Sequence, residues 1–163
     1  MKYAENYLDI ANEIKAIKRV NSNEKAMVPK LLEYGMLVMH NYKEGQNKIA
    51  GFYIMPKYEM SLLDHLEKHK FAPSEIFRMT LSLIDIFESI HDSGYVYNDL
   101  KPQNIMVTKE GQFVLIDLGM VKKIITKGKH IEDGTVSKFQ GNLLFSSLRA
   151  MMLKTTSRRD DIS

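Results

Sequence analysis

The stretch Tyr97-Asn98-Asp99-Leu100-Lys101-Pro102-Gln103-Asn104 decides how this chain of 163 residues is interpreted. It places an acid, an amine and an amide on one polar loop, directly before the apolar run 105–107. A second apolar run, 113–116, follows the turn-prone Lys109-Glu110-Gly111, so the two runs predict a compact antiparallel hairpin. Because the two ends of a hairpin lie side by side, Asp117, which follows it, is expected to meet Asn104.

The residue types around this hairpin suit phosphoryl transfer. Asn104 and Asp117 would offer two oxygen ligands to Mg²⁺, which also takes phosphate oxygens in such sites. Asp99 could act as a base near an attacking hydroxyl group, and Lys101 adds positive charge for the developing phosphate. A single aspartate in a loop is most often a turn or cap residue, so the joint spacing carries the interpretation.

The N-terminal third of the sequence predicts one helix and one hairpin. Apolar residues recur at helical spacing over 7–20 with charges between them, which places Glu13 in the middle of the helix. The apolar runs 37–40 and 49–55 flank the turn-prone residues 43–47. These two runs are therefore expected to pair as antiparallel strands.

Two further helices and a long loop complete the expected elements. Ser61-Leu62-Leu63-Asp64 has the S-x-x-D form that starts a helix, here predicted over about 61–69. A longer helix should begin near Pro73 and end shortly before Gly94, with one apolar stripe along it: Ile76, Met79, Leu83, Phe87 and Ile90. Residues 126–147 are rich in Gly, Lys, Ser and Thr, which indicates a long exposed loop.

Composition narrows the class of protein without naming an activity. The chain has 44% hydrophobic residues, so it can bury one core, and it has no cysteine, so disulfides, thiolate nucleophiles and cysteine-based zinc sites are excluded. Its 23 basic and 20 acidic residues are intermixed, which argues against a nucleic-acid partner. No apolar run approaches the roughly 20 residues of a membrane span, and residues 1–10 lack the apolar core of a signal sequence. A soluble protein without membrane contact, intracellular and cytoplasmic by default, is expected.

The sequence D-L-K-P-Q-N, followed by a hairpin and Ile116-Asp117-Leu118-Gly119, closely resembles the catalytic and metal-binding loops of eukaryotic protein kinases. The order of the other expected elements is similar as well. The resemblance implies a partial α+β, bilobal protein-kinase-like fold. Residues 1–55 would form a partial N-lobe with helix αC and strands 4 and 5. Residues 56–163 would form a partial C-lobe with αD, αE, the catalytic loop, the hairpin and the activation segment, ending at the start of αF.

The same resemblance assigns roles to four residues and implies ATP and Mg²⁺ as cofactors. Asp99 would be the catalytic base, and Lys101 would lie near the γ-phosphate. Asn104 and Asp117 would hold the metal ion. A lysine two residues after the aspartate is typical of serine/threonine kinases and argues against a tyrosine kinase.

Five further residues are implied in nucleotide binding. Lys2 lies eleven residues before Glu13, a distance compatible with the strand 3 lysine and the αC glutamate of kinases, although a solvated terminal lysine fits equally well. Met55, near the gatekeeper position, and Lys57 belong to the segment that would form the hinge facing adenine. Met106 would form the apolar floor beneath the base. Methionine also serves as ordinary core packing, so both interpretations stay open for Met55 and Met106.

Within the kinases, three segments look most similar to the casein kinase I group. They are Ser61-Leu62, the run 140–147 and Ser157-Arg158-Arg159-Asp160-Asp161, where Asp161 matches the αF aspartate. The leading hypothesis is therefore a casein kinase I-like serine/threonine kinase that transfers the γ-phosphate of ATP to the hydroxyl groups of a protein substrate.

The loop departs from the kinase pattern in one regulatory feature. The family's His-Arg-Asp reads Tyr97-Asn98-Asp99 here, so the arginine that commonly pairs with an activation-loop phosphate is replaced. We expect that phosphorylation of that loop does not switch this protein by this route.

The ends of the sequence favour a second hypothesis. The glycine-rich loop and the helices from αF onward are not seen, so the sequence looks truncated at both ends, unless a partner covers the gap. The alternative is a pseudokinase or truncated kinase that serves as a structural component of a larger protein assembly. Retention of Asp99, Lys101, Asn104 and Asp117 favours the active kinase. A kinase-like phosphotransferase for small molecules ranks last.

Overall fold

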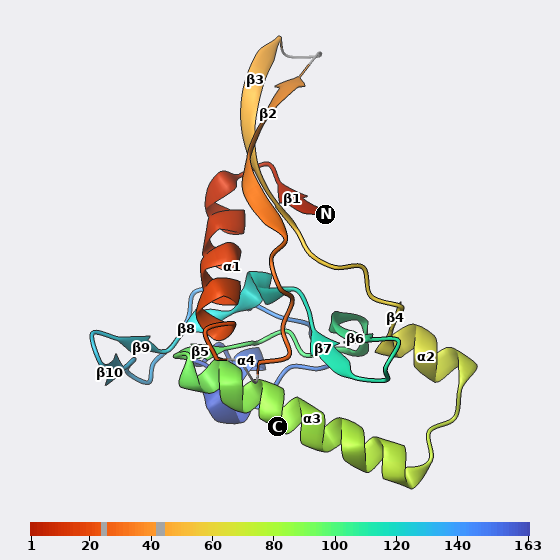
Figure 1. The fold of residues 1–163 in the computed structure, drawn as a ribbon. Helices are drawn as coiled ribbons and strands as arrows, with labels where there is room; N and C mark the ends of the chain where they lie inside the picture. Colours follow the sequence, from red (N-terminus) through yellow and green to blue (C-terminus); the bar gives the residue numbers. More distant parts are fainter. Residues whose placement is uncertain (24–25, 42–44) are drawn as a thin grey trace.

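In the computed structural model, which describes residues 1–23, 26–41 and 45–163, one sheet and one helix lie above a larger layer of helices and short strands (Figure 1). The upper sheet contains β1 (Lys2–Ala4), β2 (Glu33–Asn41) and β3 (Gln46–Ile54) in the order β1-β3-β2, with antiparallel neighbours. The expected hairpin is confirmed and is longer than the apolar runs. The turn was expected at 43–47, and the first two of these residues, 43 and 44, lie outside the described residues.

Helix α1 (Tyr7–Val20) confirms the expected helix and packs against β3. The Asn6 side chain starts the helix by accepting a hydrogen bond from the Leu8 amide at 3.0 Å. The inward residues of α1 are buried and belong to the core: Ile10, Ile14, Ala16, Ile17 and Val20. Glu13 is buried among them at 3% exposure, so a charged group lies inside this interface.

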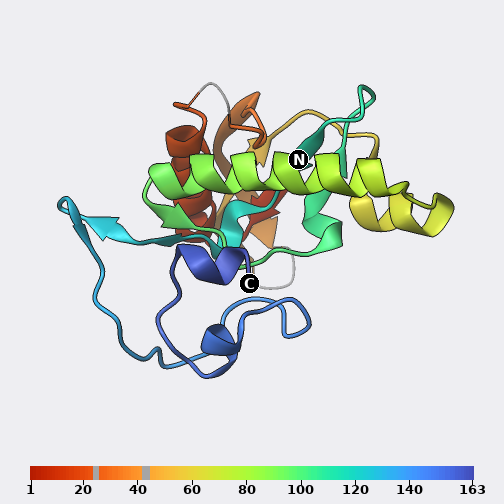
Figure 2. The same cartoon turned by 90° about the horizontal axis from the view of Figure 1, so that it is seen from below.

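Helices α2 (Leu62–Lys68) and α3 (Pro73–Asp92) lie in the lower layer, and Figure 2 shows α3 running across it. The expected capping box is present, since Ser61 Oγ accepts from the Asp64 amide and Asp64 Oδ2 accepts from the Ser61 amide, both at 3.2 Å. The expected apolar stripe of α3 is buried only in its C-terminal part, because Ile76 is 48% exposed. The N-terminal half of α3 thus presents apolar side chains at the surface.

Short strands form the frame around the polar loop. β6 (Ile105–Val107) and β7 (Phe113–Leu115) make the expected hairpin, and β4 (Met60–Ser61) extends its sheet in the order β4-β6-β7. Gly111 turns the hairpin with φ of +75°, a conformation that glycine adopts without steric cost. β5 (Tyr95–Val96) pairs with β8 (Lys122–Lys123), so the segment before the polar loop lies beside the segment that follows Asp117.

The segment expected as a long loop contains more structure than the sequence indicated. β9 (Ile125–Thr126) and β10 (Lys129–His130) form a small hairpin, and irregular chain follows as far as α4 (Leu148–Met151). A 3₁₀ turn, Arg158–Asp161, ends the regular structure. The hairpin was missed because two-residue strands carry no detectable period. Within the described residues, no helix has the length and apolar composition needed to cross a lipid bilayer.

One apolar cluster joins the two layers. Ile10 and Ile17 of α1 belong to the same buried cluster as Phe87 and Ile90 of α3, and Tyr97 of the polar loop lies within it. The division into lobes over 1–55 and 56–163 stays a prediction, but this shared core shows that α1 and the polar loop are held by continuous packing.

Substitution of Gly51 by alanine is expected to destabilise the packing of α1 on β3. A Cβ atom at this position would lie 2.9 Å from Ile10 Cγ2 and 3.1 Å from Tyr7 Cδ2. Relieving this overlap should cost about 1–3 kcal/mol in the free energy of unfolding, measured by urea denaturation. Gly134→Ala is the matched control, since its nearest neighbour would be 3.7 Å away. Equal stabilities of the two variants would contradict the described packing.

Candidate active site

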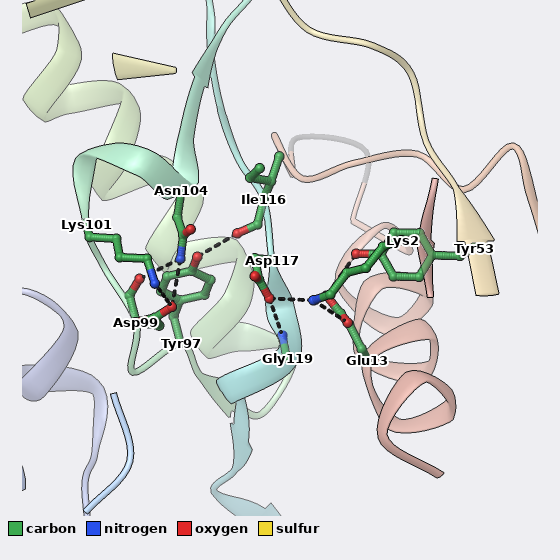
Figure 3. Close-up of polar contacts among 10 residues, drawn as sticks. All are labelled: Lys2, Glu13, Tyr53, Tyr97, Asp99, Lys101, Asn104, Ile116, Asp117 and Gly119. Carbon is green, nitrogen blue, oxygen red and sulfur yellow. Dashed lines mark hydrogen bonds and ion pairs between the residues drawn. The ribbon is translucent and has the colours of Figure 1, made fainter. Parts of the chain in front are cut away.

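The side chains of Lys101 and Asn104 converge on Asp99. Asp99 is 7% exposed, and its Oδ2 atom accepts from Lys101 Nζ at 2.6 Å and from Asn104 Nδ2 at 2.8 Å (Figure 3). Asn104 Nδ2 also contacts the Asp99 carbonyl oxygen at 3.0 Å. These bonds fix the carboxylate in one orientation and compensate for its burial.

Asp161 holds the polar loop from its other side. Its carboxylate, with a side chain only 1% exposed, accepts from the backbone amides of Tyr97 and Asn98, both at 2.8 Å. His91, near the end of α3, contacts the same carboxylate through Nε2 at 2.8 Å. Asn98 has φ of +66°, a left-handed conformation that asparagine tolerates better than most residues. The loop is therefore anchored at its start, two residues before Asp99.

Tyr97 and the backbone of Asn104 connect the loop to the end of β7. The buried Tyr97 hydroxyl donates to the Ile116 carbonyl oxygen at 2.6 Å, and the Ile116 amide donates to the Asn104 carbonyl oxygen at 2.8 Å. These contacts bring positions 104 and 117 to the same end of the hairpin. The side chains of Asn104 and Asp117 bond to different partners, Asn104 to Asp99 and Asp117 to Lys2.

Asp117 turns its carboxylate toward the upper layer. It has φ of +60°, and its Oδ1 atom accepts from the Gly119 amide at 3.2 Å and from Lys2 Nζ at 2.7 Å. Figure 3 shows Asp117 between the polar loop and the pair formed by Lys2 and Glu13. The left-handed conformation at this position thus directs the carboxylate to a residue 115 positions away in sequence.

Lys2 and Glu13 form an ion pair across the interface of β1 and α1. Lys2 Nζ lies 2.8 Å from Glu13 Oε2 and 3.0 Å from Oε1. The buried Tyr53 hydroxyl donates to Glu13 Oε1 at 2.9 Å, and Tyr53 lies opposite Lys2 in the β1–β3 pairing. Glu13 is thereby both paired and hydrogen bonded, which makes its burial tolerable.

The ion pair between Lys2 and Asp117 is accompanied by a shift in the pKa of each of these two residues. Partial burial tends to raise the pKa of Asp117, but the hydrogen bond and charge of Lys2, with the Gly119 amide, more than offset it and lower the pKa. Burial tends to lower the pKa of Lys2, and its bonds to Asp117 and Glu13 raise it overall. Burial is also the main cause of the raised pKa of the Tyr53 hydroxyl, followed by the charge of Glu13.

The three residues expected around the adenine base lie apart from this network. Met55, just after β3, is partly buried and packs against the core, while Lys57 is exposed. Met106 is partly buried on β6, opposite Val114. These positions fit core packing as well as nucleotide binding, so the roles of Met55, Lys57 and Met106 stay predictions.

Two residues of the network were not found from the sequence. Tyr53 lies two positions from Gly51 on the sheet face that meets α1, so strand alternation could have placed it beside Glu13. His91 carries no comparable signal, because a histidine near the end of a helix is usually a surface residue or a cap. Its contact with Asp161 spans 70 positions of sequence.

Comparison with known families identifies the class of protein to which this geometry corresponds. The family described as "protein kinase domain" matches residues 3–147. This match includes Glu13, the polar loop and Asp117, whose positions are given above. The chain belongs to the protein kinase domain family.

Individual relatives include proteins named for casein kinase I. The chain is 30% identical over 156 residues to a probable casein kinase I homolog of Encephalitozoon cuniculi, covering 94% of this chain and 45% of that protein. It is 33% identical over 92 residues to a casein kinase 1-like protein of Oryza sativa, covering 52% and 13%. A serine/threonine-protein kinase of Bos taurus is 25% identical over 149 residues, covering 89% and 32%. The chain thus spans less than half the length of these relatives.

The Asp117 carboxylate should make an acid-sensitive contribution to stability. Because its pKa is lowered in the folded chain, this contribution is complete above the unfolded value of about 3.9 and is lost as the pH falls through the folded-state pKa. The free energy of unfolding of the natural chain and of Asp117→Asn, measured from about pH 7 to pH 2.5, should differ by a constant amount near neutrality and converge in acid.

A Lys2→Met background provides the control for this measurement. Since Lys2 is the main group that lowers the pKa of Asp117, the acid-dependent part of the difference should shrink in that background. If the free energies of unfolding of the natural chain and of Asp117→Asn differed by the same amount at every pH, the assigned contact would be contradicted.

Proposed function

We propose that this chain carries the catalytic segment of a serine/threonine protein kinase that transfers the γ-phosphoryl group of ATP to protein hydroxyl groups. The observation that carries the proposal is the convergence of two charged groups of residues. Lys101 and Asn104 both bond to Asp99, and Lys2 bridges the carboxylates of Glu13 and Asp117. Membership of the protein kinase domain family supports the same activity.

Asp99 is the residue suited to act on the substrate hydroxyl group. It is buried and held by Lys101 and Asn104, so its orientation is set before a substrate arrives. Its carboxylate would accept the hydroxyl proton as the oxygen attacks, a role that typically contributes a factor of about 10²–10⁴ in rate. Lys101 would place positive charge beside the transferred group.

The residues at the end of the hairpin fit a magnesium ion bound together with phosphate. Asn104 uses its amide nitrogen for Asp99, which leaves its amide oxygen for a metal, and Asp117 supplies a carboxylate oxygen. Within the described residues, no group of three or more His, Cys, Asp or Glu could hold a metal ion by itself. Phosphate and water oxygens would therefore complete the ligand set. Bound Mg²⁺ would neutralise charge on the phosphates during transfer.

Lys2 is the cation best placed for the phosphates of ATP. Its side chain is 34% exposed, and its ammonium group is oriented by Glu13, whose side chain is 2% exposed. A lysine held in this way can contact a phosphate without first losing the freedom of a surface side chain. Lys2 and Glu13 would thus correspond to the lysine and glutamate pair of active kinases.

The casein kinase I type is the finer part of the proposal. It is supported by the names of two relatives and by the segments 140–147 and 157–161. A small recess beside Asn98 is lined by Lys122, Lys138 and Lys154, which suits acidic groups on a protein substrate. An acidic peptide is therefore the substrate of choice for the first assay.

One observation favours the second candidate function, a structural component of a larger protein assembly. A groove of about 670 Å³ on α3 is lined by apolar side chains that include Leu83, Ile84 and Phe87, and Ile84 is 52% exposed. Exposed apolar surface of this kind is unfavourable in water by about 25 cal/mol per Å² and is usually covered. A pseudokinase in an assembly would use this face without phosphoryl transfer.

The test of the proposed function is phosphorylation of an acidic serine-containing peptide with radiolabelled ATP and Mg²⁺, together with nucleotide binding by calorimetry. Asp99→Asn should bind ATP almost normally but lose transfer by about 10²-fold or more, because only the base is removed. Asp117→Ala should lose both, because the metal and the phosphates then lack their ligand.

Asp133→Asn is the matched control, because Asp133 is a 70% exposed aspartate that also pairs with a cation, Arg149. Its activity should stay within about twofold of the natural chain. Absence of nucleotide binding, or equal activity of the natural chain and Asp117→Ala, would reject the kinase proposal and leave the structural role.

A further inference from the structure

A second groove lies between α3 and the turn of the β6–β7 hairpin. It has a volume of about 800 Å³ and is also bordered by Asn23 and Met27, which follow α1, and by His65 of α2. Figure 1 shows α3 passing beneath this hairpin. None of the residues assigned above to ATP, Mg²⁺ or the substrate hydroxyl group lines it.

Acidic residues dominate the rim of this groove. Glu75, Asp85, Glu88 and Asp92 follow one face of α3, Glu110 projects from the hairpin turn, and the basic side chain among them is Arg78. The chain as a whole carries a net charge of +3, so this local excess of carboxylates does not follow from composition.

Three of these carboxylates are not neutralised by the part of the chain that the structure describes. Asp85, Glu88 and Asp92 form no ion pair with any described residue. They lie three or four positions apart on the same helix, where like charges repel one another. A cationic ligand would remove this repulsion.

The floor of the groove is apolar and contains one unsatisfied polar atom. Met27, Phe71 and Phe113 are partly buried against the core, and Val107 is 9% exposed. His65 Nδ1 is buried and has no hydrogen-bond partner among the described residues. The groove therefore combines charge at its edge with apolar surface and a free polar atom at its base.

The spacing of the acidic residues distinguishes between cationic ligands. In the described part of the chain, no group of three or more His, Cys, Asp or Glu side chains could hold a metal ion, so a single metal ion is a poor fit for this groove. From Glu75 to Asp92 the helix rises about 26 Å at about 1.5 Å per residue, the length of an extended peptide of about eight residues. A polyamine would match the charge but leave the apolar floor uncovered.

We propose that this groove is a docking site for an extended basic segment of another protein, in which Lys or Arg side chains face the α3 carboxylates and apolar side chains contact the Phe71 and Phe113 surface. The segment would bind by charge complementarity at the rim and by apolar burial at the floor. Docking is separate from phosphoryl transfer, so binding should persist in Asp117→Ala.

The test is fluorescence anisotropy with a labelled eight-residue peptide of alternating Arg and Leu, titrated with the natural chain. Asp85→Lys/Glu88→Lys should weaken binding at least tenfold, and raising the salt concentration from about 50 to 500 mM should weaken binding to the natural chain. Glu5→Lys/Glu132→Lys makes the same charge change at exposed positions outside the groove and should retain affinity. Unchanged circular dichroism and melting temperature would show that both variants are folded.

Two comparisons decide whether the groove itself binds the peptide. An Arg-Ser peptide should bind at least fivefold more weakly than the Arg-Leu peptide, and spermine should compete poorly. Absence of binding, equal weakening by the two double substitutions, or equal affinity of the Arg-Ser peptide would each overturn the proposal. The result leaves the kinase proposal untouched, because the assay contains neither ATP nor Mg²⁺.

Discussion

The two ion pairs of the Lys2 ammonium group are the interaction on which the candidate site depends. One pair joins β1 to Glu13 of α1, and the other joins β1 to Asp117 beyond β7. Glu13 is almost fully buried, so loss of Lys2 would leave an uncompensated charge in the core, which is far more costly than loss of a surface pair. This requirement fixes α1 and the loop after β7 relative to each other.

A second constraint acts on the backbone of the loop that carries Asp99. Asn98 and Asp117 both adopt left-handed conformations, and each is a residue type that tolerates them. Asp161 accepts the two amides at the start of the loop, and Tyr97 binds the strand that leads to Asp117. The loop that carries Asp99 is therefore positioned by hydrogen bonds to its buried backbone, and a substrate is not needed to order it.

The sequence predicted the parts of the fold that depend on local chemistry. The helix at 7–20, the capping box at Ser61 and the hairpin around Gly111 each follow from spacing or turn residues within a few positions. It also predicted that positions 104 and 117 meet, because a hairpin joins its own ends.

The remaining features depend on contacts that no local pattern encodes. Tyr53 reaches Glu13 across 40 positions and His91 reaches Asp161 across 70, so these partners became visible only in three dimensions. The spacing also predicted an apolar stripe along α3, but periodicity reports the direction of such a face and not what covers it. Within the stripe, Ile76 is exposed whereas Phe87 and Ile90 are buried.

The central claim is that Asn104, Asp117 and Lys2 surround one metal–nucleotide site. Paramagnetic relaxation by Mn²⁺, measured on the backbone amides by nuclear magnetic resonance, tests it most directly. With a non-hydrolysable ATP analogue present, the amides of Asn104, Asp117 and Gly119 should broaden first, and those near Asp85 and Glu88 should be unaffected. The claim would be contradicted if the amide signals near the exposed carboxylates of α3 broadened instead, or if the broadening did not depend on the nucleotide.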